Sequence, residues 1–231
     1  MRNGFLNEGS KGWGGWENII AGRYADSPVY RVHWGSKELK HLAFLGGGGA
    51  ARALGMNALK EAALRAARTA GRKLGPIAPT MLAADVAKNP WTVARNRAEK
   101  TGAIVADLLA RTDAESYVLV GHSLGARAMM VAAQTLGTKP RAPTIQAAHF
   151  LGAAVGAKRD CHALSATVED AIYNYHSNND GVLKYAYPIV EAGKEAAGRV
   201  GFIPGTDKVQ NIDVSTLVKE HSDYLKTVSL R

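Results

Sequence analysis

The residues best placed to do chemistry form the segment Gly-His-Ser-Leu-Gly, residues 121–125. An apolar run at residues 117–120 precedes this segment, and a helix-like run at residues 126–133 follows it. This order predicts a strand, a sharp turn and a helix, with Ser123 at the tip of the turn. A serine hydroxyl is a weak nucleophile at neutral pH, so it needs a fixed position and a neighbouring base. The pattern therefore predicts a nucleophilic serine; the simpler alternative is a glycine-rich turn whose serine caps the helix.

An acid and a base are expected further along the chain. Where a nucleophilic serine lies in a turn between a strand and a helix, both partners follow it in sequence, and each comes after a later strand. A strand-like run at residues 171–176 precedes a polar turn that contains Asp180. A second run at residues 209–214 precedes the segment that contains His221. We expect His221 to take the serine proton as general base. Asp180 would fix the tautomer of the imidazole and stabilise the imidazolium.

Other carboxylates and histidines compete for these roles. Asp213 also ends a strand-like run, but it would follow the last strand of the expected order, and Asp170 begins a strand at the wrong end. His122 adjoins the serine with its side chain expected to point away, and His176 alternates within a strand. For His221 itself the alternative is a surface histidine at the start of a helix. The remaining histidines are expected in structural or surface positions: His33, His41, His149 and His162.

Two backbone N–H groups are needed to hold the oxyanion that forms when the serine attacks a carbonyl group. One belongs to Leu124, the residue after the nucleophile. The other comes from a loop after an early strand, and residues 3–5 are predicted to end such a strand. We expect the N–H of Phe5 to fill this role, with Leu6 as second choice. The alternative is an ordinary frayed N-terminus.

Predicted strands alternate with predicted helices along the chain, which indicates an α/β fold with a mostly parallel sheet and helices on both faces. The predicted strands are residues 1–5, 29–34, 117–120, 145–151, 171–176 and 209–214. The predicted helical segments are residues 13–20 (helical or irregular), 50–74, 90–111, 126–133 and a C-terminal helix. Because the chain begins close to the strand that would supply the oxyanion loop, we expect an α/β-hydrolase fold with reduced N-terminal strands.

A helical cap or lid is predicted at residues 40–88, inserted into a single domain of residues 1–231. One face of its long helix carries four charged side chains: Glu61, Arg65, Arg68 and Arg72. Residues 75–88 are apolar and interrupted by prolines, as in a mobile lid or the wall of an acyl-chain site. A basic amphipathic helix can also lie on an anionic membrane. The alternative is a solvated helix that packs on the sheet through small residues.

Composition places the chain among ordinary globular proteins. Of its 231 residues, 46% are apolar and 21% are charged. A single cysteine excludes an intramolecular disulfide. The N-terminus lacks the apolar stretch of a signal peptide, and no run approaches the roughly 20 apolar residues that span a bilayer. We therefore expect a protein that is cytoplasmic, or exported without a cleavable signal peptide, and not transmembrane.

The net charge of +9 bears on the partners to expect. Such a charge favours anionic lipid headgroups or nucleic acid, or simply solubility. The chain shows no nucleic-acid motif and no zinc-ligand spacing, so we expect peripheral contact with an anionic membrane or an acidic substrate rather than with nucleic acid. The glycine run at residues 46–49 lacks the Lys-Ser/Thr of a phosphate loop. No metal or organic cofactor is expected.

Residues 121–127, with Asp180 and His221-Ser222-x-Tyr224, resemble the corresponding segments of the DUF726 family of α/β-hydrolase-like proteins, and the resemblance extends over most of the chain. The resemblance implies the same triad of Ser123, Asp180 and His221. Eukaryotic members have a long apolar middle segment that is read as membrane-spanning; here the corresponding stretch is shorter and charged, so membrane integration is not expected. The residues that carry the resemblance are Gly4-Phe5-Leu6, Trp34, Asn89-Pro90-Trp91, residues 121–127, Asn174-Tyr175 with Asp180, residues 198–204, residues 211–215 and His221-Ser222-x-Tyr224.

The sequence therefore predicts a serine hydrolase that cleaves carboxylic esters through an acyl-enzyme, above all lipid esters, in the manner of a lipase or phospholipase. An antibacterial lipase effector of bacteria, with an immunity or delivery partner, is one role compatible with the lipid preference and the charge. Two other classes stay open. One is a carboxylesterase or acyl-protein thioesterase with a soluble substrate, and the other is a non-catalytic, hydrolase-like binding module.

Overall fold

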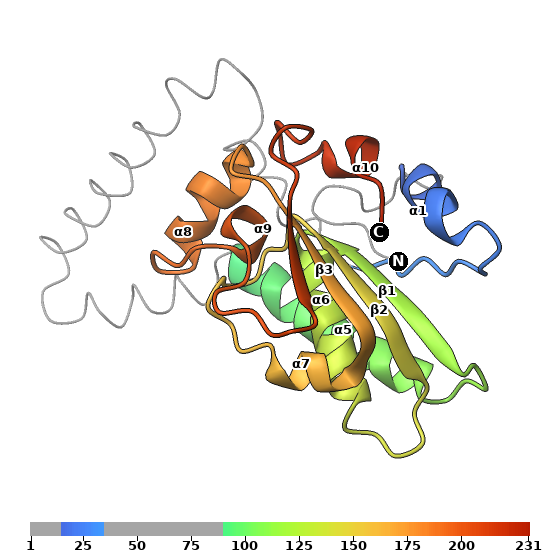
Figure 1. Cartoon of the computed structure of the whole chain (residues 1–231). Helices are drawn as coiled ribbons and strands as arrows, with labels where there is room; N and C mark the ends of the chain where they lie inside the picture. The colour runs from blue at the N-terminus through green and yellow to red at the C-terminus, as the bar shows by residue number, and fades with distance from the viewer. Residues whose placement is uncertain (1–14, 35–89) are drawn as a thin grey trace, which may run out of the picture.

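The computed structural model describes residues 15–34 and 90–231 (Figure 1). The strands of these residues form one sheet of four, in which each strand lies parallel to its neighbours. Their order in space is their order along the chain: β1 (Ser116–His122), β2 (Thr144–Leu151), β3 (Val168–His176) and β4 (Val209–Asp213). The α/β class and the parallel sheet predicted from the sequence are thereby confirmed.

The strand register separates the side chains into two layers. One row of paired residues crosses all four strands through Leu119, Ala148, Ile172 and Val209, and its members belong to or pack against one hydrophobic cluster. The next row lies on the opposite face and runs through Val120, His149, Tyr173 and Gln210. Both faces are covered over the carboxyl halves of β1 and β2, where consecutive residues are buried, whereas β4 has no buried residue.

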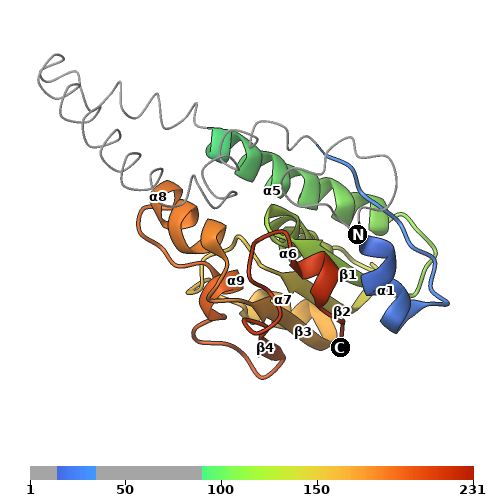
Figure 2. The same cartoon turned by 90° about the horizontal axis from the view of Figure 1, so that it is seen from above.

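Helices cover both faces. The first cluster includes α5 (Pro90–Leu109), α6 (Leu124–Leu136) and α7 (His162–Thr167), and α5 packs along α6 (Figure 2). The second cluster joins the opposite face to α1 (Trp16–Tyr24) and α10 (Tyr224–Thr227), which contact each other. Its largest members are buried Trp16 of α1, Tyr175 of β3 and Tyr224 of α10.

Three short elements follow β3 at the carboxyl edge of the sheet. A π-helical turn, η3 (Val182–Ala186), continues into α8 (Tyr187–Val190), and α9 (Ala197–Val200) comes after it. The turn after β1 and the segment after β4 end at the same edge, because the strands are parallel. Loops at this edge commonly carry the ligand site of an open α/β sheet.

The predicted elements at residues 90–111, 126–133, 145–151, 171–176 and 209–214 are confirmed as α5, α6, β2, β3 and β4. The predicted helical segment near residues 13–20 becomes α1, shifted toward the C-terminus, and the C-terminal helix is only four residues long. The predicted strand at residues 1–5, the helix at 50–74 and the cap at 40–88 lie outside the described residues. No helix of the described ranges is long and apolar enough to cross a membrane.

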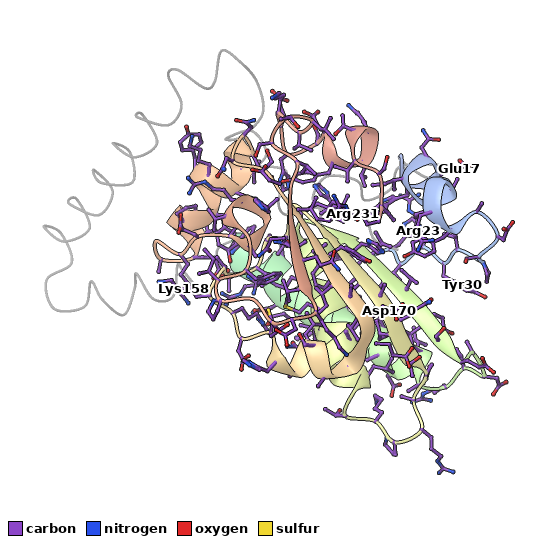
Figure 3. All side chains as sticks on the ribbon, in the orientation of Figure 1. Glu17, Arg23, Tyr30, Lys158, Asp170 and Arg231 are labelled. Carbon is purple, nitrogen blue, oxygen red and sulfur yellow. The ribbon has the colours of Figure 1, made fainter. Side chains whose placement is uncertain are left out.

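The prediction of a strand at residues 29–34 was wrong. Val32 alone makes a β-bridge there. The alternating pattern has another cause, because Val29 packs against the second cluster while Val32 and Trp34 join the first. Tyr30 points to solvent (Figure 3). The segment therefore passes from one face of the sheet to the other and gains its alternation from that path.

Candidate active site

Ser123 lies between the last residue of β1 and the first residue of α6, in a backbone conformation that few residues adopt. Its φ is 57° and its ψ is −123°. Its N–H donates to the carbonyl of Leu151 (3.0 Å), and its carbonyl accepts from the N–H groups of Ala126 (3.1 Å) and Ala154 (3.2 Å). Such a conformation costs of the order of 1–3 kcal/mol and persists where the surroundings impose it. Bonds to β2, to α6 and to the loop after β2 supply that constraint.

Gly121 explains how strand and helix approach so closely around the serine. A Cβ at this position would lie 2.5 Å from the carbonyl oxygen of Gly125 and 2.7 Å from the Cα of Ala126. Both neighbours are backbone atoms, so no side chain can move aside to make room. The glycine before the serine is therefore required by packing between β1 and the first turn of α6.

Asp180 and His221 meet at the same edge of the sheet, although 41 residues separate them. Nδ1 of His221 lies 2.6 Å from Oδ2 of Asp180. The aspartate is fully buried, and its other oxygen accepts the N–H of Leu183 at 3.0 Å. His221 itself is only 9% exposed, so the alternative of a surface histidine is wrong. Each carboxylate oxygen of Asp180 thus contacts a donor, and this fixes the orientation of the carboxylate and of the His221 ring beside it.

The second ring nitrogen of His221 has a different environment. Nε2 is buried and has no hydrogen-bond partner among the described residues. With a proton on Nδ1 held by the Asp180 carboxylate, Nε2 of a neutral imidazole is a proton acceptor. Leaving such an atom unpaired costs about 1–3 kcal/mol, which most buried polar groups avoid. An unpaired acceptor on a fixed imidazole can accept a proton from a reacting hydroxyl.

His122 supports the backbone of His221. Its Nε2 lies 2.9 Å from the carbonyl oxygen of His221, and the two rings are 4.7 Å apart between centroids. Because a carbonyl only accepts, Nε2 of His122 carries the proton. Burial, and then the neighbouring His221, hold the pKa of His122 well below its usual range. The sequence predicted only that this ring points away from the serine. The contact between His122 and His221 could not be predicted, because residues 99 positions apart share no local sequence pattern.

The competing carboxylates take no part in this arrangement. The carboxylate of Asp213 is exposed at the end of β4 and accepts the N–H (2.8 Å) and the hydroxyl (2.5 Å) of Ser215. Asp170 is exposed near the start of β3, at the opposite end of that strand from the Asp180 turn (Figure 3). The structure therefore brings Asp180, and neither of these two, to His221.

The backbone donors predicted for the oxyanion are described only in part. Leu124 is fully buried as the first residue of α6, so its N–H belongs to the first turn, whose donors have no partner within the helix. Phe5 and the second choice, Leu6, lie outside the described residues.

An apolar pocket opens beside Ser123. The other residues that line it come from α5, the loop after β2, η3 and α8: Trp91, Ala154, Val182, Leu183, Ala186, Tyr187 and Val190. Apart from the hydroxyl of Ser123, only the lining residues Trp91 and Tyr187 have polar atoms in their side chains, so the lining is largely carbon. The turn that carries the Asp180 carboxylate leads directly into η3, so Asp180 and one wall of the pocket belong to the same segment.

Cys161, the single cysteine, lies apart from this arrangement. The thiol is buried, and burial raises its pKa to about 11, so it stays protonated and is a poor nucleophile at neutral pH. Within residues 15–34 and 90–231, no three histidine, cysteine, aspartate or glutamate side chains gather as a metal site would require.

Fold and site together define an α/β protein with a parallel sheet, a serine in a constrained turn after β1 and a buried Asp–His pair at the same sheet edge. The chain belongs to the DUF726 family, a family of proteins of unknown function whose sequence model matches residues 23–230. The family resemblance noted in the sequence is thereby confirmed.

Curated relatives come from fungi and a plant. An "uncharacterized membrane protein C6F6.13c" of Schizosaccharomyces pombe is 31% identical over 148 residues, which is 62% of this chain and 19% of the relative. The "transmembrane and coiled-coil domain-containing protein STS1" of Oryza sativa is 27% identical over 219 residues, which is 92% of this chain and 32% of the relative. The "probable lipase MIL1" of Saccharomyces cerevisiae is 30% identical over 143 residues, which is 61% of this chain and 13% of the relative.

The chain thus spans less than a third of the length of these relatives. No solved structure matches it. The one relative among these three whose name states an activity is the yeast protein, and that activity is a lipase.

Proposed function

We propose that the chain is a serine hydrolase of the α/β-hydrolase fold that cleaves carboxylic esters, with lipid esters as its substrates. The observation that carries the proposal is the buried 2.6 Å contact between His221 Nδ1 and Asp180, with Nε2 of the same ring unpaired within the part of the chain that the structure describes. Ser123 lies at the same sheet edge, in a turn between strand and helix that fits a nucleophile elbow. Serine, histidine and aspartate in these roles are the parts of an acyl-transfer site.

In the proposed reaction, Nε2 of His221 takes the proton of the Ser123 hydroxyl as Oγ attacks the ester carbonyl carbon. Asp180 keeps the proton on Nδ1 and stabilises the imidazolium that forms. The N–H of Leu124 and that of Phe5 hold the oxyanion of the tetrahedral intermediate. The imidazolium then protonates the leaving alkoxide, and an acyl-enzyme remains on Ser123. Water that His221 deprotonates attacks this ester and releases the acid.

Lipid esters are the proposed substrates for three reasons. The lining of the pocket beside Ser123 is almost entirely apolar, which suits an acyl chain. A relative that shares 30% of its residues with this chain over the matched region is named a probable lipase. The net charge of +9 fits contact with an anionic membrane surface, where such substrates reside.

The proposal is tested by comparing the hydrolysis of a short soluble ester with that of a long-chain ester in anionic vesicles. We expect the wild type to hydrolyse both, with the higher kcat/KM in vesicles. Ser123→Ala should lower kcat by a factor on the order of 10⁴ or more while the circular dichroism spectrum stays unchanged. Full activity of Ser123→Ala would contradict the proposal.

The same assay separates the two other classes. Hydrolysis of the short ester with no gain in vesicles would identify a soluble-substrate carboxylesterase or acyl-protein thioesterase. A folded wild type that hydrolyses neither ester would indicate a non-catalytic binding module.

A further inference from the structure

A charge network with a buried ion pair at its centre, and two partly exposed members, lies beside the pocket. The guanidinium of Arg127, whose side chain is 7% exposed, contacts Glu99 at 3.0 Å and Glu191 at 3.4 Å. The side chain of Glu191 is 9% exposed and also faces Arg95 at 3.4 Å. Two arginines and two glutamates thus meet between α5, α6 and the end of α8, and their charges cancel.

This network holds three parts of the pocket wall. The indole N–H of Trp91 donates to Glu191 at 3.0 Å, which fixes the α5 side. Nε of Arg127 donates to the carbonyl of Ala154 at 3.0 Å, and the N–H of Ala154 in turn donates to the carbonyl of Ser123. Glu191 directly follows Val190, the last pocket residue of α8. One ion pair therefore sets the positions of Trp91, Ala154 and α8 relative to the serine.

Two contacts fix the position of the Trp91 side chain: the hydrogen bond to Glu191 and the packing against Tyr187. Its ring meets that of Tyr187 edge to face, with centroids 5.7 Å apart and planes at 90°. Burial raises the pKa of Tyr187 to about 12, so the phenol stays neutral in this wall. A buried indole needs a partner for its N–H, and Glu191 supplies it.

The energetic balance favours a role in geometry over a role in stability. Burying the Arg127–Glu191 pair is costly, and apolar residues of similar volume commonly give equal or greater stability. What apolar residues would not supply is a directional bond that fixes one rotamer of a large side chain. The ion pair accordingly acts as the support of the Trp91 wall.

We propose that Trp91, held by the Glu191–Arg127 pair, is the residue that limits the length of the acyl chain that the pocket accepts. Trp91 is the specificity-determining side chain, and Glu191 and Arg127 are positioning residues that act through it. The inference rests on the proposed function in that it takes the occupant of the pocket to be the acyl chain of the ester.

The test measures chain-length preference both with and without catalysis. Dissociation constants of fatty acids from four to sixteen carbons are measured by calorimetry on the Ser123→Ala protein, with and without Trp91→Ala. In parallel, kcat/KM is measured for p-nitrophenyl esters of the same lengths on the proteins that retain Ser123. We expect Trp91→Ala to shift both optima to longer chains, with gains of about 10-fold or more for chains beyond the wild-type limit.

Further variants separate the effect of the Trp91 side chain from the effect of the ion pair that holds it. Trp91→Leu also removes the bulk of the indole while keeping an apolar side chain, and it replaces Trp91→Ala if that protein does not fold. Glu191→Gln removes the charge that holds the wall and should broaden the length profile. The matched control is Glu195→Gln, which removes one charge of the exposed Arg199–Glu195 pair and should leave the profile unchanged.

An unchanged length profile in the Trp91 variants, in binding and in hydrolysis alike, would overturn the inference. If the binding profile shifts as expected while the wild type hydrolyses no ester of the series, the inference is supported and the proposed function fails. The two results are therefore distinguishable.

Discussion

His221 is held from two sides, and each contact has a distinct consequence. Asp180 binds Nδ1 at 2.6 Å and so fixes the tautomer and the ring plane. His122 donates to the main-chain carbonyl at 2.9 Å and fixes the backbone from which the ring projects. Because burial keeps His122 neutral, no second positive charge opposes the imidazolium that the proposed reaction forms on His221.

Two aspartates at the ends of neighbouring strands allow a matched comparison at the residue scale. Asp180→Asn keeps the shape of the side chain but removes the charge opposite Nδ1, so we expect ester hydrolysis to fall by a factor on the order of 10⁴ in kcat. Asp213→Asn removes an exposed carboxylate that bonds only to Ser215 in the contacts described, and we expect activity within about two-fold of the wild type. Equal losses in the two variants would refute the assignment of the acid.

The residues of the candidate site could be predicted from the sequence where chain order and local pattern coincide. The glycine–serine turn has a strand before it and a helix after it, and the order of acid and histidine then selects Asp180 and His221. The network around Arg127 and the contact of His122 with His221 could not be predicted, because they join residues 27 to 99 positions apart whose spacing carries no periodic pattern.

At the scale of elements, the candidate site depends on how closely β1 approaches α6. Apolar runs identified β2 and β3 because consecutive residues of these strands are buried on both faces of the sheet, while β4, which was also predicted correctly, has no buried residue. Alternation failed at residues 29–34, where it reflects a segment that passes between two hydrophobic clusters. Local pattern thus predicts burial well, and it predicts strand pairing only where other strands are present to pair.

Two glycines on different elements test the close packing of β1 on α6. In Gly121→Ala the added methyl group would meet backbone atoms at 2.5–2.7 Å, so we expect loss of several kcal/mol in the free energy of unfolding, or no folded protein. In Gly22→Ala, within α1, nothing lies within 4 Å of the new Cβ, and the better helix former should stabilise the protein by about 0.5–1 kcal/mol. Urea denaturation of both variants measures the difference. A stable Gly121→Ala protein would refute the packing argument.

Across the whole molecule, buried neutral histidines lie on the sheet and at its carboxyl edge. His149 of β2 contacts the hydroxyls of Tyr24 (2.8 Å) and Tyr175 (3.2 Å), which link α1 to the face of the sheet. Tyr173 stacks on its ring at 4.8 Å between centroids. Burial lowers the pKa of His149 to about 3, and it lowers that of His122 well below the usual range.

These shifts predict how stability depends on pH. Below the pKa of an exposed histidine, about 6.5, the unfolded chain binds protons at both positions while the folded protein does not. Unfolding is therefore favoured as pH falls, and the stabilisation is complete only above about pH 6.5. Each histidine should contribute a loss of about 1.4 kcal/mol per pH unit between pH 6 and the folded-state pKa.

Urea denaturation between pH 7.5 and 4.5 measures this dependence. His149→Phe keeps an aromatic ring beside Tyr173. It should reduce the number of protons taken up on unfolding by about one, and with it the slope of the free energy of unfolding against pH. A free energy of unfolding that stays constant from pH 7 to pH 5 would contradict the neutral buried histidines.

Covalent labelling with a fluorophosphonate probe tests whether His221 activates Ser123. The adduct is located by mass spectrometry in the wild type and in Ser123→Ala, His221→Gln and Asp213→Asn, the last as a folded control. We predict one adduct, on Ser123, that is retained in Asp213→Asn and lost in the other two variants. An adduct elsewhere in the chain, or labelling of Ser123 that proceeds equally well without the His221 imidazole, would contradict the claim.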